Sequence, residues 1–593
     1  MSTLKLSGLN SGSSIIKAPD SGSTGVTFTL PASAGTLVTS ADVPITTSAT
    51  SNIGLGANAV DSITTGDYNV GLGDNALTAV TTGVNNTGLG YNALAALSTG
   101  NNQLAVGWNA LAAATTGHSN TAIGVEALKT LTTASNNTAI GKLCLRDNTS
   151  GSNNVAIGKN ALSVNTTASS NTAVGAYALT TNTTGTRLTA VGFDALKNNT
   201  GSFNTAVGSN CLTANTSGAQ NVAVGDYTLN ANTTASFNTA IGQGALLVNT
   251  TGSENVAIGT DALVTNTTAT KNTAVGRQAL LANTTGPNAV AVGYRALAGN
   301  TAGWNNVGIG YRALGSNTTA SYSTAVGYDA LYANTTGAGN TAIGYQALKT
   351  NTTGAYNAAL GFEALAATTT ASGNTVVGRR AGYQLTTGAY NTIVGHLGAS
   401  NNGGLITGSE NTLIGAFADP SATNGGQQIV IGYDCTGVGN NSITIGKGHA
   451  STDRIYNYFT SNATWTHSSD ERAKKDIAAN TDCGLAFIND LRTVTYKWKA
   501  PSEYDVTMNA YDAEKTEPSY DKKMYGFIAQ EVKAAMDTHN ITDFNGWNQI
   551  ENDAQDNMQG VSYEMFVMPL VKAVQELSAE NTAIKARLTT LEG

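Results

Sequence analysis

A glycine recurs every 17 residues through most of this 593-residue chain, and that period limits the folds the chain can adopt. The series runs from Gly56 to Gly192, takes one step of 16 to Gly208, and continues at 17 to Gly395. Around each glycine the sequence is close to Asn-Thr-Ala-(Val/Ile)-Gly-x-x-Ala-Leu-x-x-Asn-Thr-Thr-Gly. A strand–helix–strand unit needs about 30 residues, more than one repeat supplies. We therefore expect each repeat to form one rung of a stacked β-structure.

The consensus predicts a role for each position of the rung. Small and branched residues alternate before the glycine, as in a short strand, and the glycine leaves room for a turn or a neighbouring backbone. Leucine stands four residues after the glycine in eighteen consecutive repeats, from Leu77 to Leu365, and predicts a ladder of buried side chains. The Asn-Thr-Thr-Gly segment has the residues of a turn. We expect two short strands and two bends in each rung.

Composition indicates a fibre that is stabilised by stacking. Only 11% of the residues are charged, against about 25% in ordinary globular domains. Each rung has few large apolar side chains, so we expect residues 51–450 to form a shaft that depends on contact with identical chains, as a homotrimer. The net charge of −8 argues against a nucleic-acid partner. The sequence has no run of 18 apolar residues, so we expect no membrane insertion.

The two positions after each glycine vary and are expected at the surface. Acids at the second position lie two to four rungs apart, which makes a poor catalytic pair within one chain, although acids of neighbouring subunits could meet to form a glycosidase. These acids are Glu126, Asp194, Asp261, Asp329 and Glu363. The same positions carry residues that could stack on sugars, anchor protein contacts, cover the outer face or fill a trimer seam: Trp108, Tyr294, Arg295, Tyr311, Arg312, Tyr328, Tyr345, Phe362, Arg379 and Arg380.

The four cysteines have no metal-ligand spacing. Cys144, Cys211 and Cys435 stand three residues after a repeat glycine, where alanine is usual, and are expected to be buried like the alanine they replace. Cys483 lies closer to the C-terminus. We expect no metal site and no cofactor.

Three short motifs follow the repeats and a linker at residues 451–468. They are Ser469-Asp470-x-Arg472-x-Lys474, then Tyr525-Gly526-Phe527-Ile528-Ala529-Gln530-Glu531-Val532, and finally Val561-Ser562-Tyr563. Together they resemble the self-cleaving intramolecular chaperone domain of phage tail fibres and tail spikes, of the endosialidase type. The resemblance implies that residues 469–593 are such a domain, with Gly526, Gln530, Glu531, Asp470 and Arg472 supporting the motif.

The resemblance also implies a cleavage site and a mechanism. Ser469 would be the nucleophile that attacks the carbonyl of Ser468, with Lys474 as base, and the chain would be cut between Ser468 and Ser469. Positions five apart lie about 140° apart on a regular helix, so the site would need a bend or two subunits. Ser468-x-x-Glu471 is also a capping box, which predicts a helix start whether or not the chain is cut.

The C-terminal region predicts a small α+β domain that ends in a helix. We expect helices at residues 484–492 and 528–536, a strand at 493–499, and an exposed insertion at 505–521. A heptad seam over residues 570–591 is typical of a coiled coil that sets trimer register, with one polar residue inside it; a single amphipathic helix docked on its own domain is the alternative. The seam consists of Leu570, Val574, Leu577, Asn581, Ile584, Leu588 and Leu591.

The rungs also resemble the head of trimeric autotransporter adhesins, whose Asn-x-(Val)-Ala-Ile-Gly repeats build a left-handed β-roll. The closest matches are residues 154–158 and 255–259. The fold class we expect is mainly β: an elongated homotrimeric β-solenoid or β-roll of 17-residue rungs before a small α+β chaperone domain ending in a coiled-coil helix.

The resemblance to the chaperone domain favours a phage tail fibre that is made in the host cytoplasm and located in the virion, whereas the resemblance to the adhesins bears on the fold. Residues 1–50 would then attach the fibre to a tail or baseplate protein, and the fibre would bind a host cell-surface glycan or protein. The alternatives are a bacterial or prophage-encoded trimeric adhesin with the same assembly domain, and a fibre with polysaccharide depolymerase activity.

Overall fold

The computed structural model describes residues 51–400, 404–448, 454–458, 466–467, 477–504, 511, 513–518, 522–549 and 559–593. The chain divides into two compact units, residues 1–468 and 469–593. The segment expected to attach the protein to a particle, residues 1–50, lies outside the described residues.

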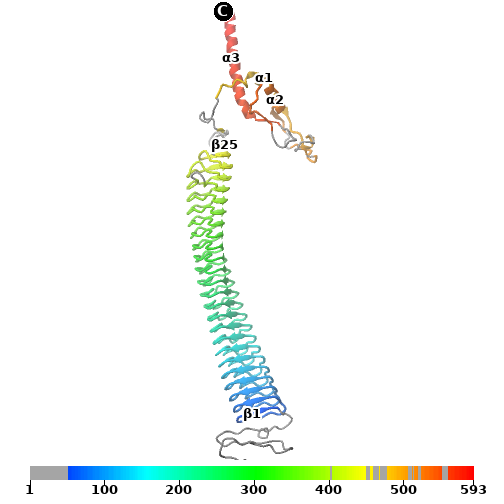
Figure 1. The fold of residues 1–593 in the computed structure, drawn as a ribbon, viewed down its shortest axis with the longest axis vertical. Helices are drawn as coiled ribbons and strands as arrows, with labels where there is room; N and C mark the ends of the chain where they lie inside the picture. Colours follow the sequence, from blue (N-terminus) through cyan, green and yellow to red (C-terminus); the bar gives the residue numbers. More distant parts are fainter. Residues whose placement is uncertain are drawn as a thin grey trace, which may run out of the picture. The chain divides into compact units, whose positions relative to one another are not determined.

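The described part of the first unit is a parallel β-solenoid whose rungs stack along one axis (Figure 1). Almost every rung contributes one strand of three residues. The strands are β1 (Ile53–Leu55), β2 (Val70–Leu72), β3 (Thr87–Leu89), β4 (Leu104–Val106), β5 (Thr121–Ile123), β6 (Thr138–Ile140), β7 (Val155–Ile157), β8 (Thr172–Val174), β9 (Thr189–Val191), β10 (Thr205–Val207), β11 (Val222–Val224), β12 (Thr239–Ile241), β13 (Val256–Ile258), β14 (Thr273–Val275), β15 (Val290–Val292), β16 (Val307–Ile309), β17 (Thr324–Val326), β18 (Thr341–Ile343), β19 (Ala358–Leu360), β20 (Thr375–Val377), β21 (Thr392–Val394), β22 (Thr412–Ile414), β23 (Gln428–Ile431) and β24 (Ser442–Gly446). The predicted β-solenoid of 17-residue rungs is confirmed.

Each strand pairs in parallel with the equivalent residues of the next rung. Ala173, for example, lies opposite Ala190 in the β8–β9 pair. The rung that is one residue short keeps this register, because Ala190 in turn lies opposite Ala206. Its turn reads Asn-Thr-Gly where the preceding rung reads Asn-Thr-Thr-Gly, so the missing residue is lost from the turn and not from the strand.

The expectation of two strands in every rung is wrong. The remainder of the rung is a series of turns in which several residues adopt left-handed backbone, as Ser170 (φ 62°), Tyr177 (φ 62°) and Leu179 (φ 51°) do around β8. Left-handed residues spaced this closely interrupt an extended chain, so a second strand does not form.

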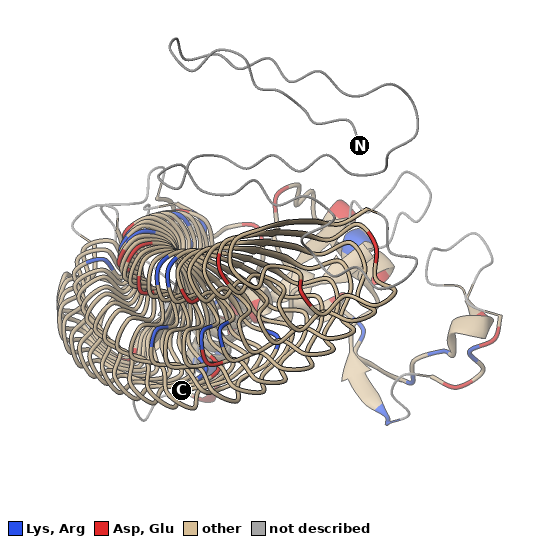
Figure 2. Ribbon diagram, turned by 90° about the horizontal axis from the view of Figure 1, so that it is seen from below, with Lys and Arg blue, Asp and Glu red and all other residues tan. Residues whose placement is uncertain are grey.

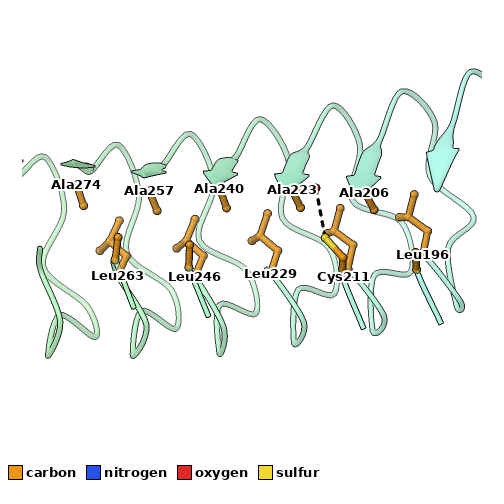
Figure 3. Packing of buried hydrophobic residues seen from close by; sticks show 14 of the residues in the cluster. Leu196, Ala206, Cys211, Ala223, Leu229, Ala240, Leu246, Ala257, Leu263 and Ala274 are labelled. Atoms are coloured by element: carbon orange, nitrogen blue, oxygen red, sulfur yellow. Dashed lines mark hydrogen bonds between the residues drawn. The ribbon is translucent and has the colours of Figure 1, made fainter. Parts of the chain in front are cut away.

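The leucine ladder forms the interior of the solenoid, as predicted. All eighteen leucines from Leu77 to Leu365 are fully buried, and they lie in one core with the alanines from the middle of most strands. Figure 3 shows Leu229, Leu246 and Leu263 in line, with Ala240 and Ala257 facing them. Cys144, Cys211 and Cys435 are buried in the same core as free thiols, which confirms their prediction.

Buried asparagine side chains form hydrogen bonds with backbone N–H and C=O groups at the bends of the rungs. The amide N–H of Asn171 donates to Oδ1 of Asn154 in the previous rung (3.0 Å), and its Nδ2 donates to the carbonyl of Gly185 in the next (2.9 Å). Asn182 forms part of a second ladder, with Nδ2 donating to Gly185 (2.9 Å) and to Oδ1 of Asn165 (3.3 Å). Unsatisfied buried polar groups are costly, so these ladders explain why asparagine recurs at both positions.

Two antiparallel strands follow the last parallel pair. β25 (Arg454–Tyr458) pairs with β24, and β26 (Thr466–His467) pairs with β25. Both strands fall within residues 451–468, the segment that the sequence presents as a linker. They occupy the hydrogen-bonding edge at which another rung would otherwise add.

The second unit is a small α+β domain. Its elements are α1 (Leu485–Asn489), β27 (Val494–Tyr496), η2 (Pro501–Glu503), β28 (Met524–Gly526), α2 (Ala529–Thr538), β29 (Trp547–Gln549), β30 (Gln559–Val561), η3 (Tyr563–Phe566) and α3 (Val567–Glu592). β27 pairs with β28 and β29 with β30, both antiparallel. The core contains Phe487 of α1, Val532 and Met536 of α2, and Phe566. No helix in the described part of the chain combines the length and apolar character that a membrane crossing requires.

Candidate functional sites

The expected cleavage site cannot be placed in the structure. Ser468, Ser469, Asp470, Arg472 and Lys474 lie outside the described residues. The roles of Ser469 as nucleophile and Lys474 as base therefore stay predictions. The boundary between the two compact units falls between Ser468 and Ser469.

The second and third motifs, which are distant in sequence, meet at Tyr563. The Phe527 N–H donates a hydrogen bond to the Tyr563 hydroxyl (3.1 Å), and the two rings stack with centroids 5.9 Å apart. A Cβ on Gly526 would collide with the Tyr563 hydroxyl, so the motif requires glycine at this position. The Tyr496 ring packs nearby, and burial, followed by the neighbouring Tyr563, raises the pKa of the Tyr496 hydroxyl.

The polar members of the second motif have different surroundings. Glu531, in the first turn of α2, forms an ion pair with Arg492, and this guanidinium lowers the pKa of the Glu531 carboxyl. Arg492 lies 39 residues earlier in the chain, so sequence spacing offered no signal for this partner. Gln530 lines a cavity of about 580 Å³ together with Tyr496, Trp498 and Tyr563. The second motif spans the end of β28 and the start of α2, and its contacts with Tyr563 connect both elements to η3.

The terminal helix α3 is tied to its own domain only near its start. Pro569 and Ala573 are buried, and Glu576 accepts a hydrogen bond from the Leu485 N–H at the start of α1 (2.6 Å). The six apolar seam residues are exposed in the single chain, and Leu591 reaches 83%. They are Leu570, Val574, Leu577, Ile584, Leu588 and Leu591. An amphipathic helix docked on its own domain would bury this seam. The exposed seam therefore argues against the docked-helix alternative.

Four of the five acids expected on the surface of the shaft are held by cations of the same chain. Lys129 pairs with Glu126 (2.6 Å) and Lys197 with Asp194 (3.0 Å), each within one rung. Asp329 and Glu363 pair with arginines of adjacent rungs, Arg312 (2.7 Å) and Arg380 (2.5 Å). The expectation of surface exposure is wrong for Asp329, which is 1% exposed. These ion pairs link residues within a rung or between adjacent rungs of the shaft.

The aromatic residues directly after the glycines form a continuous stack. Successive ring centroids of Tyr294, Tyr311, Tyr328, Tyr345 and Phe362 lie 5.2, 4.9, 5.3 and 5.0 Å apart. The guanidinium groups of Arg277 (5.9 Å) and Arg379 (5.8 Å) lie over the two end rings. Each ring face is therefore covered by a neighbour, and only the ring edges reach solvent. A sugar stacks on a free face, so this aromatic ladder is not a sugar platform.

Comparison with known proteins supports the interpretation of the second unit. The family model described as the chaperone of endosialidase matches residues 469–541. The match begins at Ser469, the first residue of the second compact unit. No curated protein and no solved structure matches the chain significantly. A β-solenoid shaft followed by an intramolecular chaperone domain defines a fibre- or spike-type protein.

Proposed function

We propose that this protein is a homotrimeric phage tail fibre that attaches to the host surface, and that residues 469–593 align its three chains and then cut themselves off. The observation that carries the proposal is the match to the chaperone family, which starts at Ser469 directly after the solenoid unit. Residues 1–50 would join a tail or baseplate protein, and the assembled fibre would be part of the virion.

The need for an aligning domain follows from the repeat. Identical rungs allow chains to associate one rung out of step at nearly the same local energy. A coiled coil at one end removes this ambiguity, because its seam includes the polar Asn581, and a single polar residue in a seam selects one register. The exposed seam of α3 supports this role.

The shaft has its own surface for a second copy. The apolar residue just before each glycine is exposed on many rungs, including Leu89, Ile140, Ile241, Ile309 and Leu360. An exposed apolar stripe of this extent is typical of a contact surface. A partner that matches it rung after rung must have the same period, and another copy of this chain meets that requirement.

The proposed cleavage consists of two acyl transfers, first from nitrogen to oxygen and then from oxygen to water. The Ser469 hydroxyl attacks the carbonyl carbon of Ser468 and its proton passes to Lys474. Lys474 then gives the proton to the peptide nitrogen, which leaves as the free amine of Ser469. The resulting ester is hydrolysed by water, which yields a fragment ending at Ser468 and one starting at Ser469. Lys474 can accept the proton only if its pKa is lowered from about 10.4, and the neighbouring cations Arg472 and Lys475 would act in that direction.

Intact-mass measurement of purified protein tests this proposal. Wild type is compared with Ser469→Ala and Lys474→Ala, and Ser468→Ala is the control because it leaves nucleophile and base in place. We expect fragments that meet at Ser468 and Ser469 in wild type and in the control, and uncut chain in the other two variants. Uncut wild type, or equal cutting of Ser469→Ala, would contradict the proposed processing.

A further inference from the structure

A second set of aromatic residues lies five positions before the repeat glycine. In five consecutive rungs this position holds Tyr322, Gly339, Tyr356, Gly373 and Tyr390, so that tyrosine and glycine alternate. We call the three tyrosines the tyrosine row. They are 56%, 75% and 67% exposed, respectively.

The glycines of this segment make room for the tyrosine rings. A Cβ added at Gly339 would lie 2.8 Å from Cδ1 of Tyr356, and one at Gly373 would lie 2.7 Å from Cδ1 of Tyr390. Each ring therefore extends over the glycine of the preceding rung. Tyr322 follows Asn305 in the preceding rung instead, and its ring contacts Trp304 of that rung.

The backbone at this position favours smaller residues. All three tyrosines have left-handed backbone, with φ of 61°, 58° and 59°. This conformation favours glycine and asparagine, and the preceding rungs place Asn288 and Asn305 there. Other rungs have the same backbone with a large side chain at this position, as Phe203 and Phe237 do (φ 62° for both), so the conformation belongs to the rung.

The tyrosine row differs from the aromatic ladder in what covers its rings. Tyr322 contacts the ring of Trp304 edge-on, with centroids 4.6 Å apart. Within the described residues, no ring or cation lies over Tyr356 or Tyr390. These rings are therefore open to a ligand, whereas the ladder rings are covered by one another.

The surroundings of the tyrosine row are polar but uncharged. The five segments 319–324, 336–341, 353–358, 370–375 and 387–392 contain no Lys, Arg, Asp or Glu. Each segment begins with an exposed threonine, such as Thr336, Thr353 and Thr370, whose hydroxyl can bond to a ligand. Figure 2 shows that most of each rung carries no charged residue.

We propose that Tyr322, Tyr356 and Tyr390 bind an extended, neutral polysaccharide that runs along the shaft. Equivalent tyrosines are two rungs apart, about 10 Å, which is close to the length of a disaccharide unit in an extended chain. Each ring would stack on one sugar face of alternate units, while the threonine hydroxyls bond to the sugar hydroxyls. This inference rests on the proposed attachment function and names the ligand class for it.

The test is binding of the purified full-length fibre to an array of neutral polysaccharides and their oligosaccharides. Wild type is compared with the triple variant Tyr322→Ala/Tyr356→Ala/Tyr390→Ala. Tyr68→Ala is the matched control, because Tyr68 is exposed at the same position of a distant rung and has the same left-handed backbone. We expect wild type and the control to retain oligosaccharides of four or more units, and the triple variant to bind them at least about tenfold more weakly.

Two further measurements make the result decisive. Gly373→Asn keeps all three tyrosines but displaces the Tyr390 ring, because a Cβ there would lie 2.7 Å from Cδ1 of that ring. We expect this variant to weaken binding without loss of fold as judged by circular dichroism. The intact masses of the same samples report self-processing, so a fibre that is cut but retains no neutral glycan overturns only this inference. Equal retention by wild type and the triple variant also overturns it.

Discussion

Arg312 donates two hydrogen bonds to the carboxylate of Asp329 in the next rung, from Nε (2.9 Å) and from Nη2 (2.7 Å). Both residues occupy the second position after a repeat glycine, and both have left-handed backbone. The Arg312 guanidinium also lies over the rings of Tyr311 (5.1 Å) and Tyr332 (4.5 Å). The pair with Asp329 raises the pKa of Arg312 further above its usual value.

Arg312→Ala should destabilise these rungs by about 2 kcal/mol, because it leaves the buried Asp329 carboxylate without its cation. The double variant Arg312→Ala/Asp329→Ala should lose less, since no unpaired charge remains. Hydrogen exchange of residues 307–331 measures the effect locally. Equal exchange in wild type and Arg312→Ala would mean that the pair contributes nothing to the stack.

Gly158→Ala should separate two rungs. A Cβ there would lie 2.6 Å from the carbonyl oxygen of Gly175, and the backbone φ of +126° disfavours any side chain. We expect a loss of about 3 kcal/mol or more, seen as faster hydrogen exchange on both rungs.

Gly244→Ala is the control for that variant. Its φ is also positive (+67°), but an added Cβ would meet only Oδ1 of the Asp261 side chain, at 3.0 Å. We expect a cost of only about 1 kcal/mol. If the two variants exchange alike, contact between successive glycine backbones does not limit the rung spacing.

The buried thiols should make the shaft sensitive to alkali. Burial raises the pKa of Cys144 to about 11 and that of Cys211 to about 12, from an ordinary value of 9.0. The folded state then holds a proton that the unfolded state releases, so each thiol's contribution is complete below pH 9 and is lost as the pH rises toward 11 or 12. The loss should be about 1.4 kcal/mol per pH unit and group within that window.

Thermal unfolding between pH 8 and pH 11 measures this effect. Cys144→Ala/Cys211→Ala should flatten the alkaline decline, and it should fold normally because alanine is usual at this position. Iodoacetamide at pH 8 should leave both thiols unmodified until the protein unfolds. A variant that declines as steeply as wild type would exclude the thiols as the cause.

The exposed seam of α3 should determine the number of chains that associate. Ile584→Asp places a charge in the seam and should prevent trimers, whereas Ala586→Asp, on the same helix but outside the seam, should not. Both variants are made with Ser469→Ala so that the helix stays attached, and sedimentation measures the mass. Trimers of the Ile584→Asp protein would place the decisive contacts in the shaft.

Much of the fold could be predicted because equivalent residues of successive repeats stack on one another. The 17-residue period, the leucine ladder and the buried cysteines each follow from residues that recur at one position and must stack on their equivalents. The prediction of a second strand in each rung was wrong. Tyr177 and Leu179 adopt left-handed backbone, which tyrosine and leucine rarely do, so their residue types do not reveal the turns.

The sequence by itself determined that this chain is a stacked β-shaft followed by a chaperone-like domain, since a strict period and three short motifs need no knowledge of distant contacts. Only the tertiary structure decided which surface residues are covered and which are open. Tyr328 and Tyr356 look equivalent as exposed aromatics in a repeat, yet the first lies between two rings and the second has an open ring. The reason is that stacking brings residues 17 apart to one rung spacing, so the neighbours in adjacent rungs determine what each side chain can bind.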